Sequence, residues 1–197
     1  MNENQFIVHV SETCKANNVK FYLSEGERVN VDGIRSHGYF GDNPPTLAVG
    51  TRSKEFFDTL IHESCHLDQW LEKYPLWIKS TKYNDDTIIN EYLIEKTPIT
   101  DRIILALNRV QEIELDCERR AIKKINTLNL PINLTKYTLK SNAYIYLYSL
   151  LKRGYVNWPT IEPYLVKPIL DVMPKKLLSN YTMSRKLKDL YLKHCYQ

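Results

Sequence analysis

The sequence contains no long apolar run. Its most lipid-like stretch, AYIYLYSLL (143–151), has nine residues, under half of the ~20 that a membrane helix needs. Near the N-terminus, FIVHV (6–10) is too short to form the core of a signal peptide. We therefore expect a soluble, cytoplasmic protein that has no signal peptide and no contact with a membrane.

Paired cysteines are also missing. The four cysteines, Cys14, Cys65, Cys117 and Cys195, are scattered and form no CxxC motif. This spacing argues against a cysteine-rich zinc module and against the disulfide framework of a small secreted protein. We expect four small buried thiols. For Cys65 and Cys117, a thiolate that binds a metal is the less favoured alternative.

Charge of one sign does not dominate, since the net charge is only +4. It is unevenly placed, however. Residues 1–97 hold 10 basic and 15 acidic side chains, whereas residues 98–197 hold 17 basic and 8 acidic ones. A basic half can bind a polyanion, but the same asymmetry arises if the two halves pack together or if a solvated face is rich in lysine. Because no arginine cluster is interleaved with aromatic residues, we favour these two ordinary explanations over a nucleic-acid partner.

The 197 residues, 43% of them hydrophobic, fit one globular domain over residues 1–197. Periodicity and capping residues predict the following helices: 4–18, 54–73 with Ser53 as N-cap, 85–96, 100–126, 139–154 and 184–195. Alternating runs predict three short strands at 19–24, 28–33 and 46–51, the first two joined as a hairpin. Glycine, proline and asparagine predict a loop over 33–45, and the prolines between 159 and 174 leave that segment unassigned.

The segment LIHESCHLDQW (60–70) carries the clearest chemical signal. His62 and His66 are four residues apart on a predicted helix, so their side chains project side by side and two imidazoles can hold one Zn²⁺. Glu63 follows the first histidine and can take a proton from a zinc-bound water whose pKa the metal lowers to ~7. Both histidines lie away from the helix's apolar stripe, which indicates that they face something other than the core.

A third ligand is expected on the helix 100–126. On its helical wheel, Glu114 and Glu118 interrupt a narrow apolar stripe. A carboxylate on a buried stripe is costly unless it is paired or binds a metal. The two carboxylates could instead lie where the stripe ends at solvent, or form a buried salt bridge. The HExxH motif upstream favours metal binding over both alternatives.

HESCH followed by ELDCERRA (114–121) resembles the gluzincin branch of the zincin metallopeptidases. The resemblance covers residues 46–121. It implies an α+β fold in which a small N-terminal sheet of about three strands packs on the HExxH helix, followed by a helical C-terminal half whose role in residues 130–197 is unknown. It also implies that Glu114 is the third zinc ligand and that Glu118 orients a ligand histidine in place of the family's aspartate. Cys117 then takes a small position that faces the motif helix.

Further consequences of the resemblance concern the substrate. The strand 46–51 would be an edge strand that pairs with an extended peptide. His37 is a less favoured candidate for reaching the zinc or the oxyanion. Gluzincins often use a tyrosine or histidine outside the motif to stabilise the oxyanion. We weigh Tyr144, Tyr146 and Tyr148 for that role, although aromatic residues at this spacing are usually core.

These observations predict a zinc-dependent metallopeptidase with one Zn²⁺ per chain. His62, His66 and Glu114 would bind the metal, Glu63 would act as general base, and the substrate would be a peptide or protein. The alternative is a catalytically inactive protein of zincin fold that binds nucleic acid or an acidic partner through its basic C-terminal half.

Overall fold

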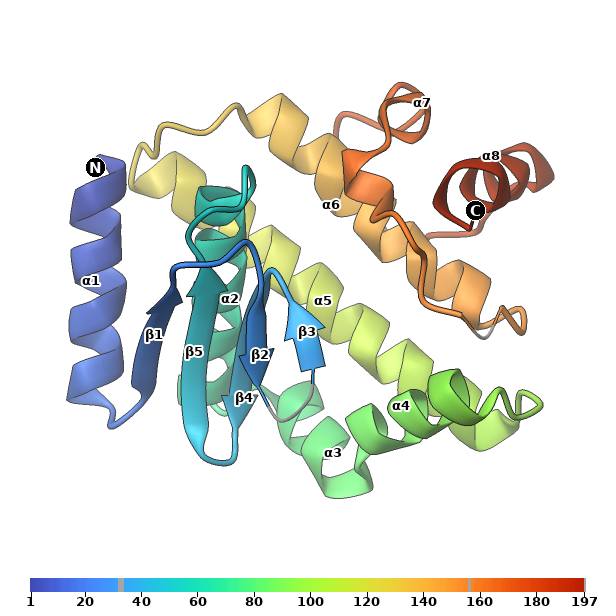
Figure 1. Cartoon of the computed structure of the whole chain (residues 1–197), viewed down its shortest axis with the longest axis horizontal. Coiled ribbons are helices and arrows are strands. Elements are labelled where there is room, and N and C mark those ends of the chain that lie inside the picture. Colours follow the sequence, from blue (N-terminus) through green and yellow to red (C-terminus); the bar gives the residue numbers. More distant parts are fainter. Residues whose placement is uncertain (32–33, 156, 197) are drawn as a thin grey trace. The chain divides into compact units, whose positions relative to one another are not determined.

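The computed structural model describes residues 1–31, 34–155 and 157–196, and it divides into two compact units (Figure 1). The first unit holds residues 1–74 and 117–132, and the second holds 75–116 and 133–197. The predicted α+β class is confirmed, because the described residues form eight α-helices and a small three-stranded sheet. That residues 1–197 act as a single domain stays a prediction.

The elements of the first unit are α1 (Glu3–Ala16), β1 (Lys20–Ser24), β2 (Val29–Val31), β3 (Ile34–Ser36), β4 (Gly38–Asp42), β5 (Pro45–Gly50), α2 (Phe56–Leu71) and the C-terminal part of α5 (Asp101–Thr127). The predicted helix 4–18 is confirmed as α1. It begins with a capping box in which Asn2 and Gln5 bond each other's backbone N–H groups.

The sheet of the first unit has the strand order β1-β5-β4. Strand β5 pairs with β1 in parallel and with β4 antiparallel. The strand 46–51 is therefore central, and the prediction that it is an edge strand is wrong. Its residues Leu47, Ala48 and Val49 are fully buried, as expected for a strand covered on both faces.

Two other strand predictions are corrected. The expected hairpin between 19–24 and 28–33 does not form, because β1 pairs with β5 and β2 pairs with β3. Residues 32 and 33 lie outside the described residues. The expected loop over 33–45 contains β3 and β4. The glycines in this segment were interpreted as loop residues. Gly38 and Gly41 instead lie within an edge strand, where glycine allows close approach of a neighbour.

Helix α2 packs on β4 and β5 (Figure 1). Phe57 and Leu60 are buried on it, and Phe57 meets Phe6 of α1 edge-to-face at a ring-centroid distance of 5.7 Å. The helix is two residues shorter at each end than predicted, and its N-cap is Glu55 instead of Ser53. The Ser53 hydroxyl instead accepts a hydrogen bond from the Glu55 backbone N–H at 3.1 Å.

The elements of the second unit are α3 (Pro75–Tyr83), α4 (Asp85–Glu95), the N-terminal part of α5, α6 (Leu134–Leu151), a 3₁₀ turn (Pro163–Leu165), α7 (Lys167–Leu170) and α8 (Arg185–Cys195). The helices predicted at 85–96, 100–126, 139–154 and 184–195 are confirmed as α4, α5, α6 and α8. Helix α3 was not predicted. Thr100 caps α5, since its hydroxyl accepts from the Ile103 N–H at 3.3 Å.

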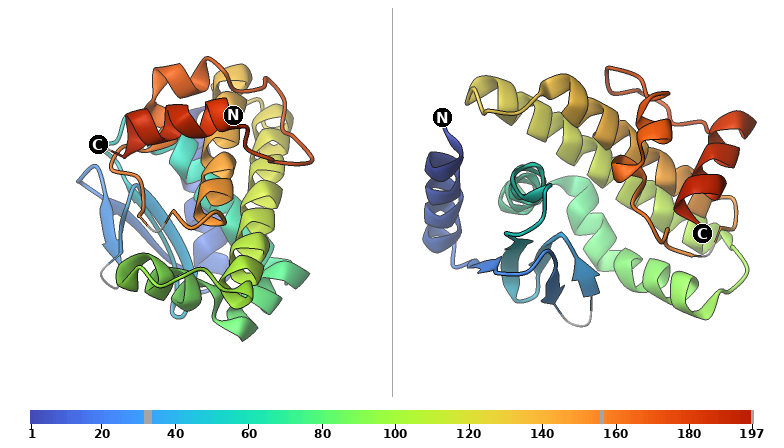
Figure 2. Two further views of the ribbon diagram at one scale, coloured as in Figure 1. Left: turned by 90° about the vertical axis from the view of Figure 1, so that its right-hand side faces the viewer. Right: turned by 45° about the horizontal axis from the view of Figure 1, so that its top comes forward.

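The C-terminal elements of the second unit pack on α6 (Figure 2). The proline-rich segment that the sequence left unassigned is anchored by hydrogen bonds to buried side chains. Asn142, which has no exposed surface, donates to the carbonyls of Pro174 and Lys176 and accepts from the Tyr181 hydroxyl. The Tyr191 hydroxyl of α8 donates to the Ala143 carbonyl at 2.6 Å.

Within the described residues, none of the helices combines the length and the apolar character that crossing a membrane requires.

Candidate metal centre

One turn of α2 carries the HExxH residues of the first unit. His62 is partly exposed, while Glu63 and His66 are 7% exposed each. Three buried apolar residues, Leu60, Ile61 and Leu67, hold this part of the helix in place. The two histidines therefore project from a rigid scaffold.

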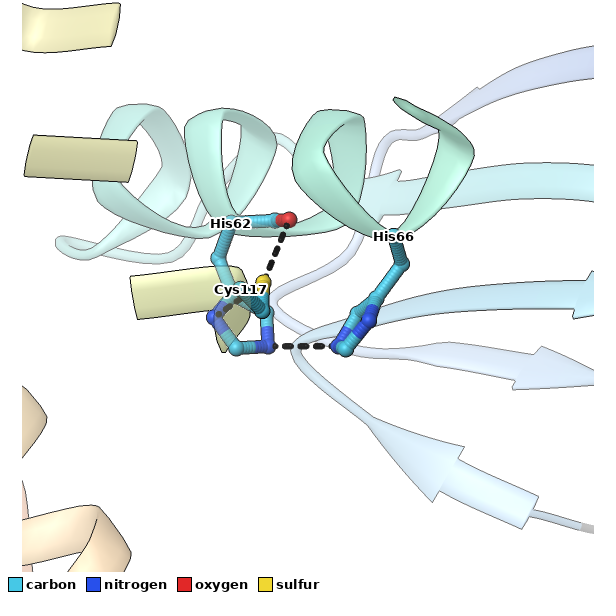
Figure 3. A group of neighbouring side chains, drawn as sticks. All are labelled: His62, His66 and Cys117. Atoms are coloured by element: carbon cyan, nitrogen blue, oxygen red, sulfur yellow. Dashed lines mark hydrogen bonds between the residues drawn. The ribbon is translucent and has the colours of Figure 1, made fainter. Parts of the chain in front are cut away.

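The two imidazole rings meet through their Nε2 atoms, which lie 3.1 Å apart (Figure 3). The ring centroids of His62 and His66 are separated by 4.7 Å, and the rings are nearly perpendicular at 87°. Two nitrogen ligands at ~2.0–2.1 Å from a tetrahedral zinc ion lie about 3.3 Å from each other. The observed spacing is close to that value.

Each histidine has a partner at its other ring nitrogen. His62 Nδ1 lies 3.0 Å from Glu118 Oε1, and His66 Nδ1 lies 2.8 Å from Gln69 Oε1. Both partners are buried. A carboxylate or carbonyl on the second nitrogen fixes the orientation of a metal-binding histidine. The Glu118 side chain thus reaches His62, although its predicted role at a metal stays a prediction. Gln69 was not recognised from the sequence.

The contact of Gln69 follows from helical spacing, because it lies three residues after His66 on the same helix. The sequence contains this signal, since an amide three residues from a helical histidine can reach its ring.

The thiol of Cys117 also lies beside His62 (Figure 3). Its Sγ atom is 3.3 Å from the His62 carbonyl oxygen and 3.5 Å from His62 Nδ1, and it forms a hydrogen bond with Cys65. His62, His66 and Cys117 form a group whose potential ligand atoms lie within 4.8 Å of one another. Such a group could bind a metal ion, and both thiols are buried and free of disulfides.

Cys117 and His66 contact different ring nitrogens of His62. The thiol lies beside Nδ1, whereas His66 faces Nε2. If Cys117 and His62 Nδ1 bound the same ion, Glu118 would lose its contact with Nδ1. If the metal binds both Nε2 atoms, Glu118 and Gln69 keep their hydrogen bonds and Cys117 keeps its bond to the His62 carbonyl. The second arrangement disturbs fewer buried polar contacts, so these residues fit a metal at the Nε2 pair best.

Glu63 lies against the edge strand of the sheet. A Cβ atom added at Gly38 of β4 would come within 2.8 Å of both Cγ and Oε1 of Glu63, and it would also clash with Cγ2 of Thr59. Glycine at position 38 therefore lets the carboxylate approach the strand backbone. This contact could not be predicted, because residues 33–45 were expected to form a loop.

Lys124 links α5 to α2 near the histidines. Its ammonium group lies 2.7 Å from Asp68 and 2.9 Å from the Ser64 hydroxyl. The side chains of Lys124 and Asp68 are 16% and 32% exposed. This partly buried ion pair helps to hold the Cys117–Glu118 turn of α5 against α2.

Glu114 belongs to the second unit, where it is buried on α5. The Tyr148 hydroxyl forms a hydrogen bond with its carboxylate, and the hydroxyls of Tyr148 and Tyr144 are 3.2 Å apart. Burial, and then the negative charge of Glu114, raise the pKa of both phenols well above the ordinary value. Tyr146 lies apart from this cluster and packs on Tyr181. That Glu114 is the third metal ligand stays a prediction.

His37 lies between β3 and β4. Partial burial lowers its pKa, and the nearby guanidinium of Arg28 lowers it further, whereas Glu55 and Glu27 oppose this effect. A role for His37 at the metal or the oxyanion stays a less favoured prediction.

Comparisons with known proteins identify no relative: no family model matches the chain, and neither a curated protein nor a solved structure matches it.

Proposed function

We propose that the protein is a zinc-dependent metallopeptidase of gluzincin type. The observation that carries the proposal is the pair of Nε2 atoms of His62 and His66, 3.1 Å apart, with Glu118 on the far side of His62. Glu118 is an acceptor, so it holds a hydrogen on His62 Nδ1 and leaves the Nε2 lone pair for a metal. Glu114 is the proposed third protein ligand, because a catalytic zinc needs three.

The chemistry is amide hydrolysis. Zinc, when bound, would polarise the scissile carbonyl and make water acidic enough to lose a proton near neutral pH. Glu63 would accept that proton and then deliver it to the leaving amine. Its buried position beside His62 keeps bulk water from competing for the proton.

A peptide substrate is supported by the position of β4. This strand forms the edge of the sheet, and its first residue, Gly38, touches Glu63. An extended peptide that added to such an edge would gain main-chain hydrogen bonds regardless of its sequence. Its backbone carbonyls would then lie near the proposed base. The peptide-binding strand is thus proposed to be β4 instead of residues 46–51.

The test is Glu63→Gln in the zinc-loaded full chain, assayed on unfolded casein and on a mixed peptide library by mass spectrometry. We expect the parent to cleave and the variant to cleave 10²–10⁴-fold more slowly, with zinc content unchanged. Glu91→Gln, an exposed change of the same kind on α4, should cleave like the parent. Equal cleavage by parent and Glu63→Gln, or none by the zinc-loaded parent, would overturn the peptidase proposal.

A second candidate function is binding without turnover, and one observation favours it. A shallow, widely open groove on one face of α8 is lined by Arg185, Lys186, Asp189, Leu190 and Lys193, and the first turn of this helix has no acidic residue. Such a surface could attract a polyanion such as nucleic acid.

Affinity for a single-stranded oligonucleotide, measured against salt concentration, tests this candidate. Binding at the groove predicts a steep fall in affinity with salt and a further loss in Arg185→Glu/Lys186→Glu. The control, Lys175→Glu/Lys176→Glu, makes the same change of charge at exposed positions outside α8. Equal effects of the two double variants, or no binding at low salt, would rule this function out.

A further inference from the structure

Within the first unit, the C-terminal part of α5 meets α2 at His62 and again two turns further on. The Cys117 Sγ atom lies 3.3 Å from the His62 carbonyl oxygen (Figure 3), and Glu118 Oε1 lies 3.0 Å from His62 Nδ1. Lys124 follows Cys117 by seven residues, which is almost two helical turns, so both side chains project from nearly the same face of α5. The two contacts are about 10 Å apart along the helix axis.

The ammonium group of Lys124 donates to three oxygens on one turn of α2. Its Nζ atom lies 2.7 Å from Asp68 Oδ2, 2.9 Å from the Ser64 hydroxyl and 3.3 Å from the Ser64 carbonyl oxygen. These acceptors match the three N–H donors of an ammonium group. Ser64 is buried, and the Lys124 side chain is only 16% exposed. Salt therefore screens this contact less than it screens a surface ion pair.

The turn that Lys124 grips is the turn that carries the histidines. Ser64 lies two residues after His62 and two before His66. Contact at the Cys117–Glu118 turn alone would let α5 pivot or slide along α2. A second contact two turns away removes that freedom, so it also fixes the distance between the Glu118 carboxylate and the His62 ring.

We propose that Lys124 is a positioning residue of the metal centre, which keeps Glu118 within reach of His62 by anchoring α5 to α2. The inference rests on the proposed function only in taking His62 and His66 as ligands of one metal ion. Lys124 is not itself a ligand, and it acts through Glu118, whose contact with Nδ1 orients the His62 ring.

The sign of the effect separates positioning from simple electrostatics. Lys124 is a cation close to the turn that carries the histidines, and its loss also removes a counter-ion of Asp68. By charge alone, zinc would then bind more tightly. If Lys124 instead positions Glu118, its loss lets the carboxylate move away from His62, and zinc binds less tightly.

Zinc affinity of the full chain, measured by competition with a chromophoric chelator, distinguishes these two effects. Lys124→Met keeps an unbranched side chain but removes the ammonium group, and we expect the affinity to fall roughly 3- to 10-fold. Lys124→Arg keeps the charge but cannot place three donors around one point, so its affinity should lie between those of the parent and Lys124→Met. Unchanged or tighter binding in Lys124→Met would overturn the proposal.

The same substitution in a Glu118→Ala background shows whether Lys124 acts through Glu118. Without the carboxylate there is nothing for Lys124 to position, so Lys124→Met should weaken zinc binding there by less than about 2-fold. An equal loss in both backgrounds would contradict the inference. Urea denaturation checks that each variant is folded. If Lys124→Met is not, Ser64→Ala replaces it in the comparison, because it removes one acceptor of Lys124 without changing any charge.

Arg120→Met is the matched control, because it removes the same charge from α5 and also breaks a contact with α2. Arg120 pairs at 2.7 Å with Glu72, the C-cap residue of α2, whose side chain is 61% exposed. An exposed pair of this kind contributes little, so zinc affinity should stay within about 2-fold of the parent value. A loss as large as that in Lys124→Met would assign the effect to the docking of α5 in general and overturn the specific role of Lys124.

Failure of this inference and failure of the proposed function look different. If the zinc affinities follow the expected pattern but the parent cleaves no peptide, Lys124 positions a metal centre in a protein that is not a peptidase. If the parent cleaves peptides and Lys124→Met binds zinc as tightly as the parent, only the inference is wrong. A parent that binds no zinc would overturn both.

Discussion

The Nε2 atoms of His62 and His66 lie 3.1 Å apart, on rings that are nearly perpendicular. Two lone pairs do not normally face each other at this distance, so the contact calls for a shared hydrogen or a cation. Its outer partners, Glu118 and Gln69, are both buried. Two histidines that are each oriented by a partner on the second ring nitrogen fit the metal site proposed above.

Removing the partner of His62 should weaken metal binding. We predict that Glu118→Ala lowers zinc affinity by 10- to 100-fold, and that Glu118→Gln, which keeps one accepting oxygen at the same reach, has a smaller effect. Competition with a chromophoric chelator gives the affinities. Glu112→Gln, exposed on the same helix, is the matched control. Parent-like affinity in Glu118→Ala would mean that the His62–Glu118 contact is only structural.

A side chain at Gly38 should displace the proposed base. In Gly38→Ala the new Cβ would overlap Glu63 and Thr59, so we expect cleavage to fall at least 10-fold while zinc content stays at the parent level. Overpacking should also cost about 1–3 kcal/mol of unfolding free energy. Thr59→Ser removes one of the clashing atoms, so the double variant Gly38→Ala/Thr59→Ser should recover part of the lost cleavage and stability. Full activity in Gly38→Ala would contradict the placement of Glu63 against β4.

The second unit depends on a buried ion pair. Arg109 donates to both carboxylate oxygens of Asp85 at 2.6 and 2.5 Å, and Asp85 has no exposed surface. Asp85→Ala should lower the free energy of unfolding by about 3–5 kcal/mol, because it leaves a largely buried guanidinium without its partner. Urea denaturation measures this.

Two further variants show whether the loss of unfolding free energy in Asp85→Ala comes from the unpaired charge of Arg109. Asp86→Ala, exposed and adjacent, should change the free energy of unfolding by less than about 0.5 kcal/mol. Asp85→Ala/Arg109→Met should recover part of the loss. A loss of similar size in Asp86→Ala would attribute the effect to the start of α4 instead of the ion pair.

The free energy of unfolding should fall at alkaline pH because the thiol of Cys14 is buried. Burial raises the pKa of Cys14 from about 9 to about 11, so the folded protein binds this proton more tightly than the unfolded chain does. The stabilisation is complete below about pH 9 and is lost as the pH rises toward 11. Cys195, with its pKa also raised to about 11, adds a similar loss.

The pH dependence can be separated from the packing of the thiol. Cys14→Ala should be less stable than the parent at pH 7, because it removes a buried atom. Between pH 9 and 11, however, its urea midpoint should fall less steeply than that of the parent. Parallel curves for parent and variant would show that Cys14 does not contribute to the alkaline loss.

The helices could be predicted because their signals are local. The buried stripe of Phe6, Val10 and Cys14 repeats with helical period, and so does the stripe on α5. Glu118 was singled out because a charge on that stripe needs a partner, and the structure places its carboxylate beside His62.

The sheet could not be predicted in the same way. Strand β1 pairs in parallel with β5, with Lys20 opposite Thr46, and such a partner is not encoded near either strand. Sequential strands 19–24 and 28–33 therefore looked like a hairpin. The glycines of β4 looked like loop residues, although Gly38 is needed there for the approach of Glu63. These errors concern long-range contacts that only tertiary packing decides.

Zinc content per chain decides whether His62, His66 and Glu114 form a metal centre. Elemental analysis would be done on protein purified without added metal and then offered zinc, for the parent, His66→Ala and Glu114→Ala. We predict one zinc per chain in the parent and a clear loss in both variants. A parent that binds no zinc after it is offered would contradict the metal centre, and His62 and His66 would then be two hydrogen-bonded histidines on a helix.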